Sequence, residues 1–295
     1  CGSGTVLIEA ISMANKQAPS IDRAYWGFDY WLGHEASAFE KALSEAREAS
    51  LETSNLFTSK IYGSDIDSRV INTAKQNARY AGYSDLIEFS VKDANKINNV
   101  FSTPGVMLFN PPYGERIGEL PELVELFSLL GQKLKQQYID WRVVILTSSV
   151  ELLSLLKLAS RKRYKFKNGP LDCQLALYDI NEQQVAKDQL TGNVDFENQQ
   201  SDFANRLKKN LKGLKGWLKS ENIDCYRCYD ADIPEFNVAV DVYQDYVVIQ
   251  EYAAPANIEP DKVARRLQEV IFWAPKVLNV ATSNVVLKTR AKQKG

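Results

Sequence analysis

The sequence predicts an α/β fold, with a mostly parallel sheet that carries helices on both faces, followed by a small α+β module. Over residues 1–182, short apolar runs typical of buried strands alternate with amphipathic helical segments, and such alternation joins parallel strands through helices. Residues 183–201 are polar, rich in Gln and Asn, and mark a linker. Residues 202–295 then begin with a basic amphipathic helix followed by strands, which indicates a second unit.

The first unit opens with a glycine-rich turn, Cys1 to Thr5, that continues directly into an apolar helix over 6–14. The periodicity then predicts helices over 34–51, 68–81, 121–138 and 150–159, and strands over 60–67, 86–91, 106–109 and 141–146. A hairpin with strands 163–166 and 171–178 adds an antiparallel edge. In the second unit we expect helices over 202–220 and 260–272, and strands over 225–229, 238–243, 246–252 and 284–288.

The composition is that of a soluble globular protein. The 295 residues are 45% hydrophobic and 25% charged, and no apolar stretch reaches the roughly 20 residues that span a membrane. Four cysteines are too few for a disulfide framework, so we expect a reducing, cytoplasmic setting. With a net charge of −1, a polyanionic partner must be held by local basic patches.

We expect no metal site. His34 is the one histidine of the chain, and nothing near it suggests a set of metal ligands. The single C-x-x-C, Cys225 to Cys228, falls in a predicted strand, where residues three apart point to opposite faces.

The string Asn110-Pro111-Pro112-Tyr113 follows directly after the predicted strand 106–109. Two prolines cannot continue a strand ladder, so the chain forms a stiff loop at a strand's carboxyl end, where open α/β sheets bind ligands. Asn110 Oδ1 and the Pro111 carbonyl can accept the two hydrogens of an exocyclic nucleobase amine, while Tyr113 can stack on the ring. These four residues are the predicted catalytic loop. The structural alternative is a proline loop beside a buried tyrosine.

Three features predict a site for an adenosine-containing cofactor. The turn Cys1, Gly2, Ser3, Gly4, Thr5 presents backbone N–H groups at a helix N-terminus. Asp65, followed by Ile66, ends the next strand, where an acid binds ribose hydroxyls, whereas Asp67 serves as a helix cap. Asp93, followed by Ala94, ends the third strand and can accept from an adenine amino group. The third glycine of the dinucleotide fingerprint is missing, which favours S-adenosylmethionine over NAD. Asn110 is expected to lie beside this cofactor as well.

Basic residues gather in two places. Arg161, Arg163, Lys165 and Lys167 interleave with Tyr164 and Phe166 and lead to Asn168, a pattern typical of a nucleic-acid surface. The helix over 202–220 carries a second set of cations, for which a solvated face is an equally good interpretation. We therefore expect the RNA-binding residues mainly in the segment 161–168.

The loop Asn110-Pro111-Pro112-Tyr113 resembles the hallmark of class I methyltransferases that modify exocyclic amines of nucleobases. The longer string through Gly114-Glu115-Arg116, with Cys1-Gly2-Ser3-Gly4-Thr5, resembles the bacterial guanine-N2 methyltransferases of 23S ribosomal RNA. Residues 229–241 and 287–290 are similar to the start of the guanine-N7 methyltransferase half that is fused to them in a bifunctional family.

The resemblance implies a Rossmann-like domain over 1–182 that lacks its first strand, and a module over 202–295 that precedes a second methyltransferase core. It implies direct methyl transfer from S-adenosylmethionine to a guanine N2 amine of large-subunit ribosomal RNA, and Arg116 joins the expected RNA-binding residues. We expect the chain to be part of a longer protein that also holds an RNA-binding domain. Two alternatives stay open: an adenine-N6 DNA methylase, which shares the loop chemistry, and a non-catalytic RNA-binding module.

Overall fold

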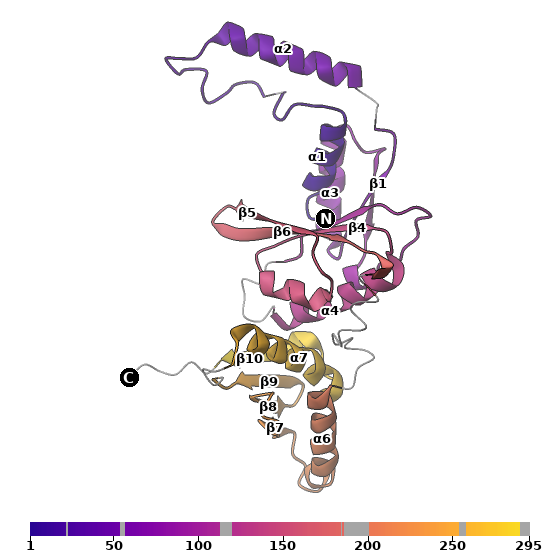
Figure 1. The fold of residues 1–295 in the computed structure, drawn as a ribbon, viewed down its shortest axis with the longest axis vertical. Coiled ribbons are helices and arrows are strands. Elements are labelled where there is room, and N and C mark those ends of the chain that lie inside the picture. The colour runs from indigo at the N-terminus through magenta and orange to yellow at the C-terminus, as the bar shows by residue number, and fades with distance from the viewer. Residues whose placement is uncertain are drawn as a thin grey trace. The chain divides into compact units, whose positions relative to one another are not determined.

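The computed structural model describes residues 1–21, 23–53, 57–112, 120–183, 185, 201–253 and 258–289. These residues form two compact units, Cys1–Ile97 and Asn98–Gly295, and each unit is described by itself. Figure 1 shows the elements of both units and labels most of them. No helix in the described ranges is both long and apolar enough to cross a membrane.

The first unit is built on two parallel strands. Its elements are α1 (Thr5–Ala14), α2 (Ala36–Thr53), β1 (Ile61–Asp65), α3 (Ser68–Tyr80), β2 (Ile87–Val91) and the short 3₁₀ helix η1 (Ala94–Lys96). β1 and β2 pair in parallel, from Ile61 beside Ile87 to Asp65 beside Val91. A small core of Ile11, Ala78 and Ile87 joins α1, α3 and β2. Each helix and strand lies within two residues of its predicted bounds.

The second unit begins with a mixed sheet. It contains β3 (Val106–Phe109), α4 (Leu120–Gln137), β4 (Arg142–Thr147), the 3₁₀ helix η3 (Val150–Leu156), β5 (Lys162–Asn168) and β6 (Leu171–Asp179). The strand order is β3-β4-β6-β5, with β3 parallel to β4 and both remaining pairs antiparallel. The predicted hairpin is thus confirmed as an antiparallel edge.

The expected parallel sheet is divided between the two units. Among the described residues, β1 pairs with β2 alone and β3 pairs with β4 alone, so each of β1 and β3 has one free edge. Apolar side chains on these strands are correspondingly exposed: Tyr62 to 51%, Val106 to 67% and Leu108 to 46%. A free ladder edge beside exposed apolar side chains is a surface that a further strand would cover.

The predicted helix over 150–159 is shorter and tighter than expected. Residues Val150–Leu156 form a 3₁₀ helix, which ends because Lys157 adopts the left-handed conformation with φ 53°. Leu152, Leu153, Leu155 and Leu156 are all buried, so the segment places two pairs of adjacent leucines in the core. A 3₁₀ helix is common in such short connectors, and the apolar pattern alone does not distinguish it from an α-helix.

The α+β module follows with α6 (Asp202–Ser220), β7 (Cys225–Asp230), β8 (Val238–Tyr243), β9 (Tyr246–Glu251), α7 (Pro260–Leu278), η4 (Thr282–Asn284) and β10 (Val285–Thr289). Its sheet has the order β10-β9-β8-β7, and α6 and α7 pack together beside it (Figure 1). The helix α7 continues past its predicted end at Phe272 to Leu278, six residues later. Pro275 lies in its last turn, and the helix ends at Asn279 in the left-handed conformation.

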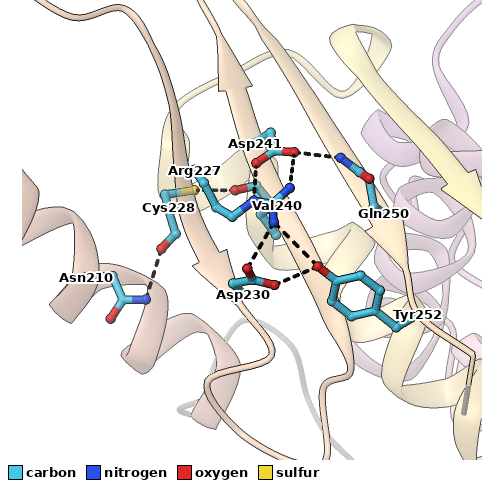
Figure 2. Close-up of polar contacts among 8 residues, drawn as sticks. All are labelled: Asn210, Arg227, Cys228, Asp230, Val240, Asp241, Gln250 and Tyr252. Carbon is cyan, nitrogen blue, oxygen red and sulfur yellow. Dashed lines mark hydrogen bonds and ion pairs between the residues drawn. The ribbon is translucent and has the colours of Figure 1, made fainter.

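A polar cluster lies on the module's sheet, and Figure 2 shows its contacts. Asp241 is 5% exposed and accepts from Arg227 Nε (2.7 Å), Arg227 Nη2 (3.0 Å) and Gln250 Nε2 (2.6 Å). Arg227 also donates to Asp230, which accepts from the Tyr252 hydroxyl. Hydrogen bonds to Asp241 and Asp230 raise the pKa of Arg227. The buried carboxylate is therefore fully compensated by its partners.

The module and the first sheet of this unit share contacts through α4 and α7. Glu125 accepts from Thr282 Oγ1 (2.7 Å) and lies 3.4 Å from Lys276 Nζ. One continuous core extends through both parts. The predicted linker 183–201 lies almost entirely outside the described residues, so the division into a 1–182 domain and a 202–295 module stays a prediction.

Candidate functional site

The glycine turn at the start of α1 has the backbone that its sequence requires. Gly2 has φ 57° and Gly4 has φ 82°, both in the left-handed region that side chains other than glycine rarely adopt. A Cβ on Gly4 would lie 3.2 Å from the Ala74 Cβ, so this glycine also lets the turn lie against α3. A Cβ on Gly2 would meet no atom within 4 Å. The space beside Gly2 is therefore open to a ligand.

Asp65, at the carboxyl end of β1, is tied to this turn. Its Oδ2 accepts from the Gly2 N–H (3.0 Å) and from the Cys1 amine (3.1 Å), and its Oδ1 accepts from the Asp67 N–H (3.1 Å). Partial burial opposes ionisation, but the hydrogen bonds from Asp67 and Gly2 outweigh it, so the pKa of Asp65 is lowered. Asp65 is an ionised acceptor at neutral pH.

Asp67 and Ile66 behave differently from Asp65. Asp67 is the N-cap of α3 and accepts from the Arg69 N–H at 2.8 Å, which confirms the predicted cap. Hydrogen bonds from Arg69 lower the pKa of Asp67 to about 2. Ile66 is 71% exposed directly beyond the strand, where an apolar side chain can cover one face of a flat ring.

Asp93 lies at the same edge of the first unit's sheet. Asp65 and Val91 are cross-strand neighbours, and the Lys92 N–H donates to the Asp65 carbonyl at 2.9 Å. Asp93 caps η1 by accepting from the Asn95 N–H (2.9 Å), and Ala94 begins that helix. Asn95 Oδ1 is buried and has no hydrogen-bond partner in the described structure. The sequence reasoning missed Asn95, whose position after a strand-ending acid was the available signal.

These residues fit an adenosine group in most respects. The open space at Gly2, the ionised Asp65 carboxylate and the exposed Ile66 side chain all belong to one edge of one unit. A carboxylate has about four acceptor positions, and the N–H groups of Gly2 and Asp67 occupy two of those on Asp65. The expectation that Asp65 accepts from both ribose hydroxyls stays a prediction.

The loop Asn110-Pro111-Pro112 belongs to the second unit. β3 ends at Phe109, as predicted, and the following three residues have no regular secondary structure. Asn110 and Pro112 are exposed and Pro111 is half-buried. Phe109 is level with Ile145 of β4, two residues before that strand ends at Thr147, so the loop begins near the carboxyl ends of two parallel strands. Tyr113 and Arg116 lie outside the described residues, so both assignments stay predictions.

The β5–β6 hairpin extends past this edge of the sheet. Lys165 faces Gln174, which faces Thr147, the last residue of β4. The ladder continues to Lys167 beside Asp172 and Asn168 beside Leu171. Lys167 and Asn168 therefore lie about 7–10 Å beyond the end of β4, at a rise of about 3.3 Å per residue. Lys167 forms an exposed ion pair of 3.0 Å with Asp172.

Arg161 and Arg163 lie toward the opposite end of the same hairpin. Arg161 Nη1 donates to Asp179 (3.1 Å), which also accepts from Arg142, and Arg163 Nε donates to Ser160 Oγ (2.9 Å). Arg161 is about 20 Å along the strand from Asn168. The structure thus separates the predicted RNA-binding residues into a group at the loop's edge and a group remote from it.

Strand geometry also separates the cations of β5 from its aromatic rings. Side chains alternate between faces, so Arg163, Lys165 and Lys167 share one face while Tyr164 and Phe166 share the other. Lys162 joins the aromatic face, with its Nζ 4.7 Å from the centre of the Tyr164 ring. Cationic and aromatic residues that alternate in the sequence therefore form two separate surfaces on opposite faces of β5. Every residue of β5 is exposed.

Two polar residues that the sequence reasoning missed form the cross-strand pair at the carboxyl end of β4, near the loop. Thr147 is fully buried, and its hydroxyl accepts from the Ser149 N–H at 3.1 Å. Gln174 faces Thr147 across the ladder, and its Oε1 is buried without a partner among the described residues. Their positions depend on strand pairing between segments far apart in sequence, which local patterns do not reveal.

The two cysteines of the C-x-x-C string lie in different environments on β7. Cys225 is exposed and Cys228 is buried, so the two lie on opposite sides of β7 as predicted. Burial raises the pKa of the Cys228 thiol to about 12, which keeps it protonated at neutral pH. The described ranges contain no group of three His, Cys, Asp or Glu side chains that could hold a metal ion.

The chain is similar to known methyltransferases along its whole length. It is 62% identical over 295 residues to the ribosomal RNA large subunit methyltransferase K/L of Colwellia psychrerythraea, and 46% identical to that of Alteromonas mediterranea. The match covers 100% of this chain and 41% of each relative, so the chain spans about two fifths of their length.

Solved structures agree on the fold. A possible methylase from Clostridium difficile 630 superposes with a TM-score of 0.54 at 30% identity, covering 62% of this chain and 47% of that one. A candidate methyltransferase complexed with S-adenosylhomocysteine (SAH) gives 0.52 at 27% identity, with 61% and 46% covered. The predicted α/β methyltransferase class is confirmed. Residues 1–176 match the RMKL-like methyltransferase domain model, and the chain therefore belongs to the RMKL-like methyltransferase domain family.

Proposed function

We propose that the protein containing this chain transfers a methyl group from S-adenosylmethionine to the exocyclic N2 amine of a guanine in large-subunit ribosomal RNA. The observation that carries the proposal is the position of Asn110-Pro111-Pro112 at the carboxyl ends of the parallel strands β3 and β4. The names of the 62% and 46% identical relatives support the substrate class. A ribosomal RNA substrate implies a cytoplasmic reaction.

The cofactor residues are proposed from the first unit. Gly2 leaves open space for the ligand, Asp65 accepts from the ribose hydroxyls, Ile66 covers the adenine ring, and Asp93 accepts from the adenine amino group. Cys1, Ser3, Gly4, Thr5 and Ala94 complete the proposed cofactor surface. The bound cofactor supplies an electrophilic methyl group on a positively charged sulfur.

The loop acts on the acceptor amine. A guanine amine is a poor nucleophile because its lone pair is delocalised into the ring. Hydrogen bonds from that amine to Asn110 Oδ1 and the Pro111 carbonyl hold it in line with the methyl group, and alignment supplies much of the rate. Tyr113 stacks on the base and offsets part of the few kcal/mol that unstacking it costs.

The test compares Asn110→Ala with Asn110→Asp in the intact protein. We expect Asn110→Ala to lower methyl transfer to ribosomal RNA by about 100-fold or more, since loss of a single positioned hydrogen bond in a catalytic site has effects of that order. Asn110→Asp retains the acceptor and should keep measurable activity. Equal rates for wild type and Asn110→Ala would remove Asn110 from the site.

The nature of the product distinguishes the proposal from its alternatives. Mass spectrometry of nucleosides from cells without the gene should show loss of N2-methylguanosine from ribosomal RNA. Loss of N6-methyladenine from DNA would instead support the DNA methylase alternative. Unchanged nucleosides, with RNA binding retained by the purified protein, would support a non-catalytic RNA-binding role.

A further inference from the structure

The helix α6 is a rigid element of the second unit. Its inner face buries Phe203, Ala204 and Leu207. At its start, Ser201 Oγ accepts from the Ala204 N–H (3.1 Å) and donates to Glu269 of α7 (2.6 Å). Further along, the Asn210 amide donates to the Cys228 carbonyl of β7 at 2.9 Å, as Figure 2 shows. These contacts fix which face of α6 points outward.

The outward face of α6 carries a row of lysines. Lys208, Lys212, Lys215 and Lys219 follow each other at intervals of four, three and four residues, which places them in one line along a helix. We call these four residues the lysine stripe. At a rise of 1.5 Å per residue the stripe is about 16 Å long. All four side chains are exposed, and Lys209 lies beside them.

Charge is concentrated here far beyond the average of the chain. The whole sequence has 36 Lys and Arg against 37 Asp and Glu. The helix has six cations (Arg206, Lys209 and the stripe) against the single acid Asp202 in its first turn. Within the described residues, neither Lys209 nor any residue of the stripe forms an ion pair. The repulsion among these cations is therefore not relieved within this part of the chain.

Two glycines lie on the exposed side of the same helix. Gly213 and Gly216 are interior positions of α6, where glycine is the least favourable residue after proline. A Cβ at either position would meet no atom within 4 Å, so packing within the described structure does not require them. At roughly 100° per residue, Gly216 lies about 70° and Gly213 about 130° around the helix from the stripe, on the side of Lys209. Trp217, 50% exposed, lies on the opposite side of the helix from the stripe.

We propose that the exposed face of α6 binds the sugar–phosphate backbone of the RNA substrate through the lysine stripe. The inference rests on the proposed function, and it deepens it by adding a surface outside the catalytic loop and the β5–β6 hairpin. Unpaired ammonium groups in a straight row complement a row of phosphates.

The experiment measures RNA binding by the intact protein as a function of salt. The quadruple variant Lys208→Gln/Lys212→Gln/Lys215→Gln/Lys219→Gln is compared with a control in which Lys41, Lys75, Lys262 and Lys288, all exposed, are changed to Gln. The probe is a 20-base-pair RNA duplex, followed by fluorescence anisotropy. Both variants lose the same charge, so any difference reports the position of the lysines.

We expect the stripe variant to bind the duplex at least about 10-fold more weakly than the control at low salt. The slope of log K against log salt should fall by about 3.6, because each of the four lost phosphate contacts removes about 0.9 of slope. Equal affinities and slopes for stripe variant and control would overturn the proposal. So would displacement of the duplex by polyglutamate at equal charge concentration, since that outcome indicates a general anion surface.

Two further variants separate binding from folding. Glutamine has a helix propensity close to that of lysine, so α6 should persist, and circular dichroism checks it. The fourfold Lys→Arg variant keeps the charge and should bind like wild type, whereas Lys212→Gln/Lys215→Gln should show about half the change in slope. If the stripe variant binds RNA as tightly as the control while the wild-type protein still transfers methyl groups, the lysine stripe is refuted. The proposed function is then unaffected.

Discussion

The backbone N–H of Gly2 donates a 3.0 Å hydrogen bond to Oδ2 of Asp65, which joins the glycine turn to the end of a strand 63 residues later in the chain. The bond holds a turn of two left-handed glycines in one conformation before any ligand binds. A preorganised turn avoids part of the ordering cost of binding. Asp65 therefore has two roles in the proposed site: it positions the turn, and it accepts from the ribose.

Replacing Asp65 should weaken the binding of S-adenosylmethionine. Asp65→Ala removes the acceptor for the ribose and frees the Gly2 N–H, so we expect the dissociation constant measured by calorimetry to rise by at least about 10-fold, equivalent to 1.4 kcal/mol. Asp67→Ala is the matched control, because it loses the cap of α3 and leaves the Gly2 bond in place. Equal affinities for the two variants would take Asp65 out of the site.

Asp65 should also make the first unit sensitive to acid. Its pKa in the folded chain is below the ordinary value of 3.8, so its stabilising effect is fully present above that value and is lost as the pH falls through the lower folded pKa. Thermal unfolding from pH 6 down to pH 2 should show this loss. Asp65→Asn should unfold at a lower temperature at pH 6, and its difference from wild type should shrink toward pH 2.

Gly131 of α4 should not tolerate a methyl group. A Cβ there would lie 2.6 Å from the Leu156 Cα and still closer to the Leu156 carbonyl oxygen, and backbone atoms cannot move aside as a flexible side chain can. We expect Gly131→Ala to destabilise the second unit by about 1–3 kcal/mol. Gly213→Ala is the control, since its Cβ enters open space and should stabilise α6 by up to about 1 kcal/mol. In urea unfolding, the midpoint should fall for Gly131→Ala and rise for Gly213→Ala.

Asp241 should matter more to stability than an exposed ion pair. Asp241→Ala leaves Arg227 and the Gln250 amide without their main acceptor, and we expect a loss of about 2 kcal/mol. The figure is below the usual cost of breaking a buried pair because the Arg227 side chain is 41% exposed and keeps Asp230. The control Lys60→Ala breaks a pair whose side chains are 53% and 50% exposed, and should leave the urea midpoint unchanged.

Tyr178 should make the fold sensitive to alkali. Burial raises the pKa of Tyr178 to about 12, and its hydroxyl has no partner among the described residues. A raised pKa means that the folded chain holds this proton more tightly than the unfolded chain, so stability falls as the pH rises from 10 toward 12. Tyr178→Phe should keep or increase stability at pH 7 and should lose less of it between pH 10 and 12. A steeper alkaline loss in the variant would contradict this.

The sequence was sufficient wherever one local signal decides the structure. The bounds of α6 follow from its helical apolar period and those of β8 from a short run of β-branched residues, and Asp67 caps α3 because a short acid precedes a helix there. The turn at Gly2 and Gly4 follows from the freedom of glycine at positive φ. Family membership can likewise be recognised from the sequence alone, because the match to the family model extends over residues 1–176.

Tertiary structure alone decided what depends on partners distant in sequence. Residues 150–156 form a 3₁₀ helix, and α7 continues through Pro275. Both backbone conformations are less favourable than a regular α-helix and depend on tertiary packing, which the apolar period of the sequence does not reveal. Strand pairing placed Gln174 beside Thr147 and separated Arg161 from Lys167 along one hairpin. The hydrogen bond from the Gly2 N–H to Asp65 joins two residues that are 63 positions apart. The physical reason is the same in each case: local sequence sets backbone preference, while long-range contacts select among the conformations that preference allows.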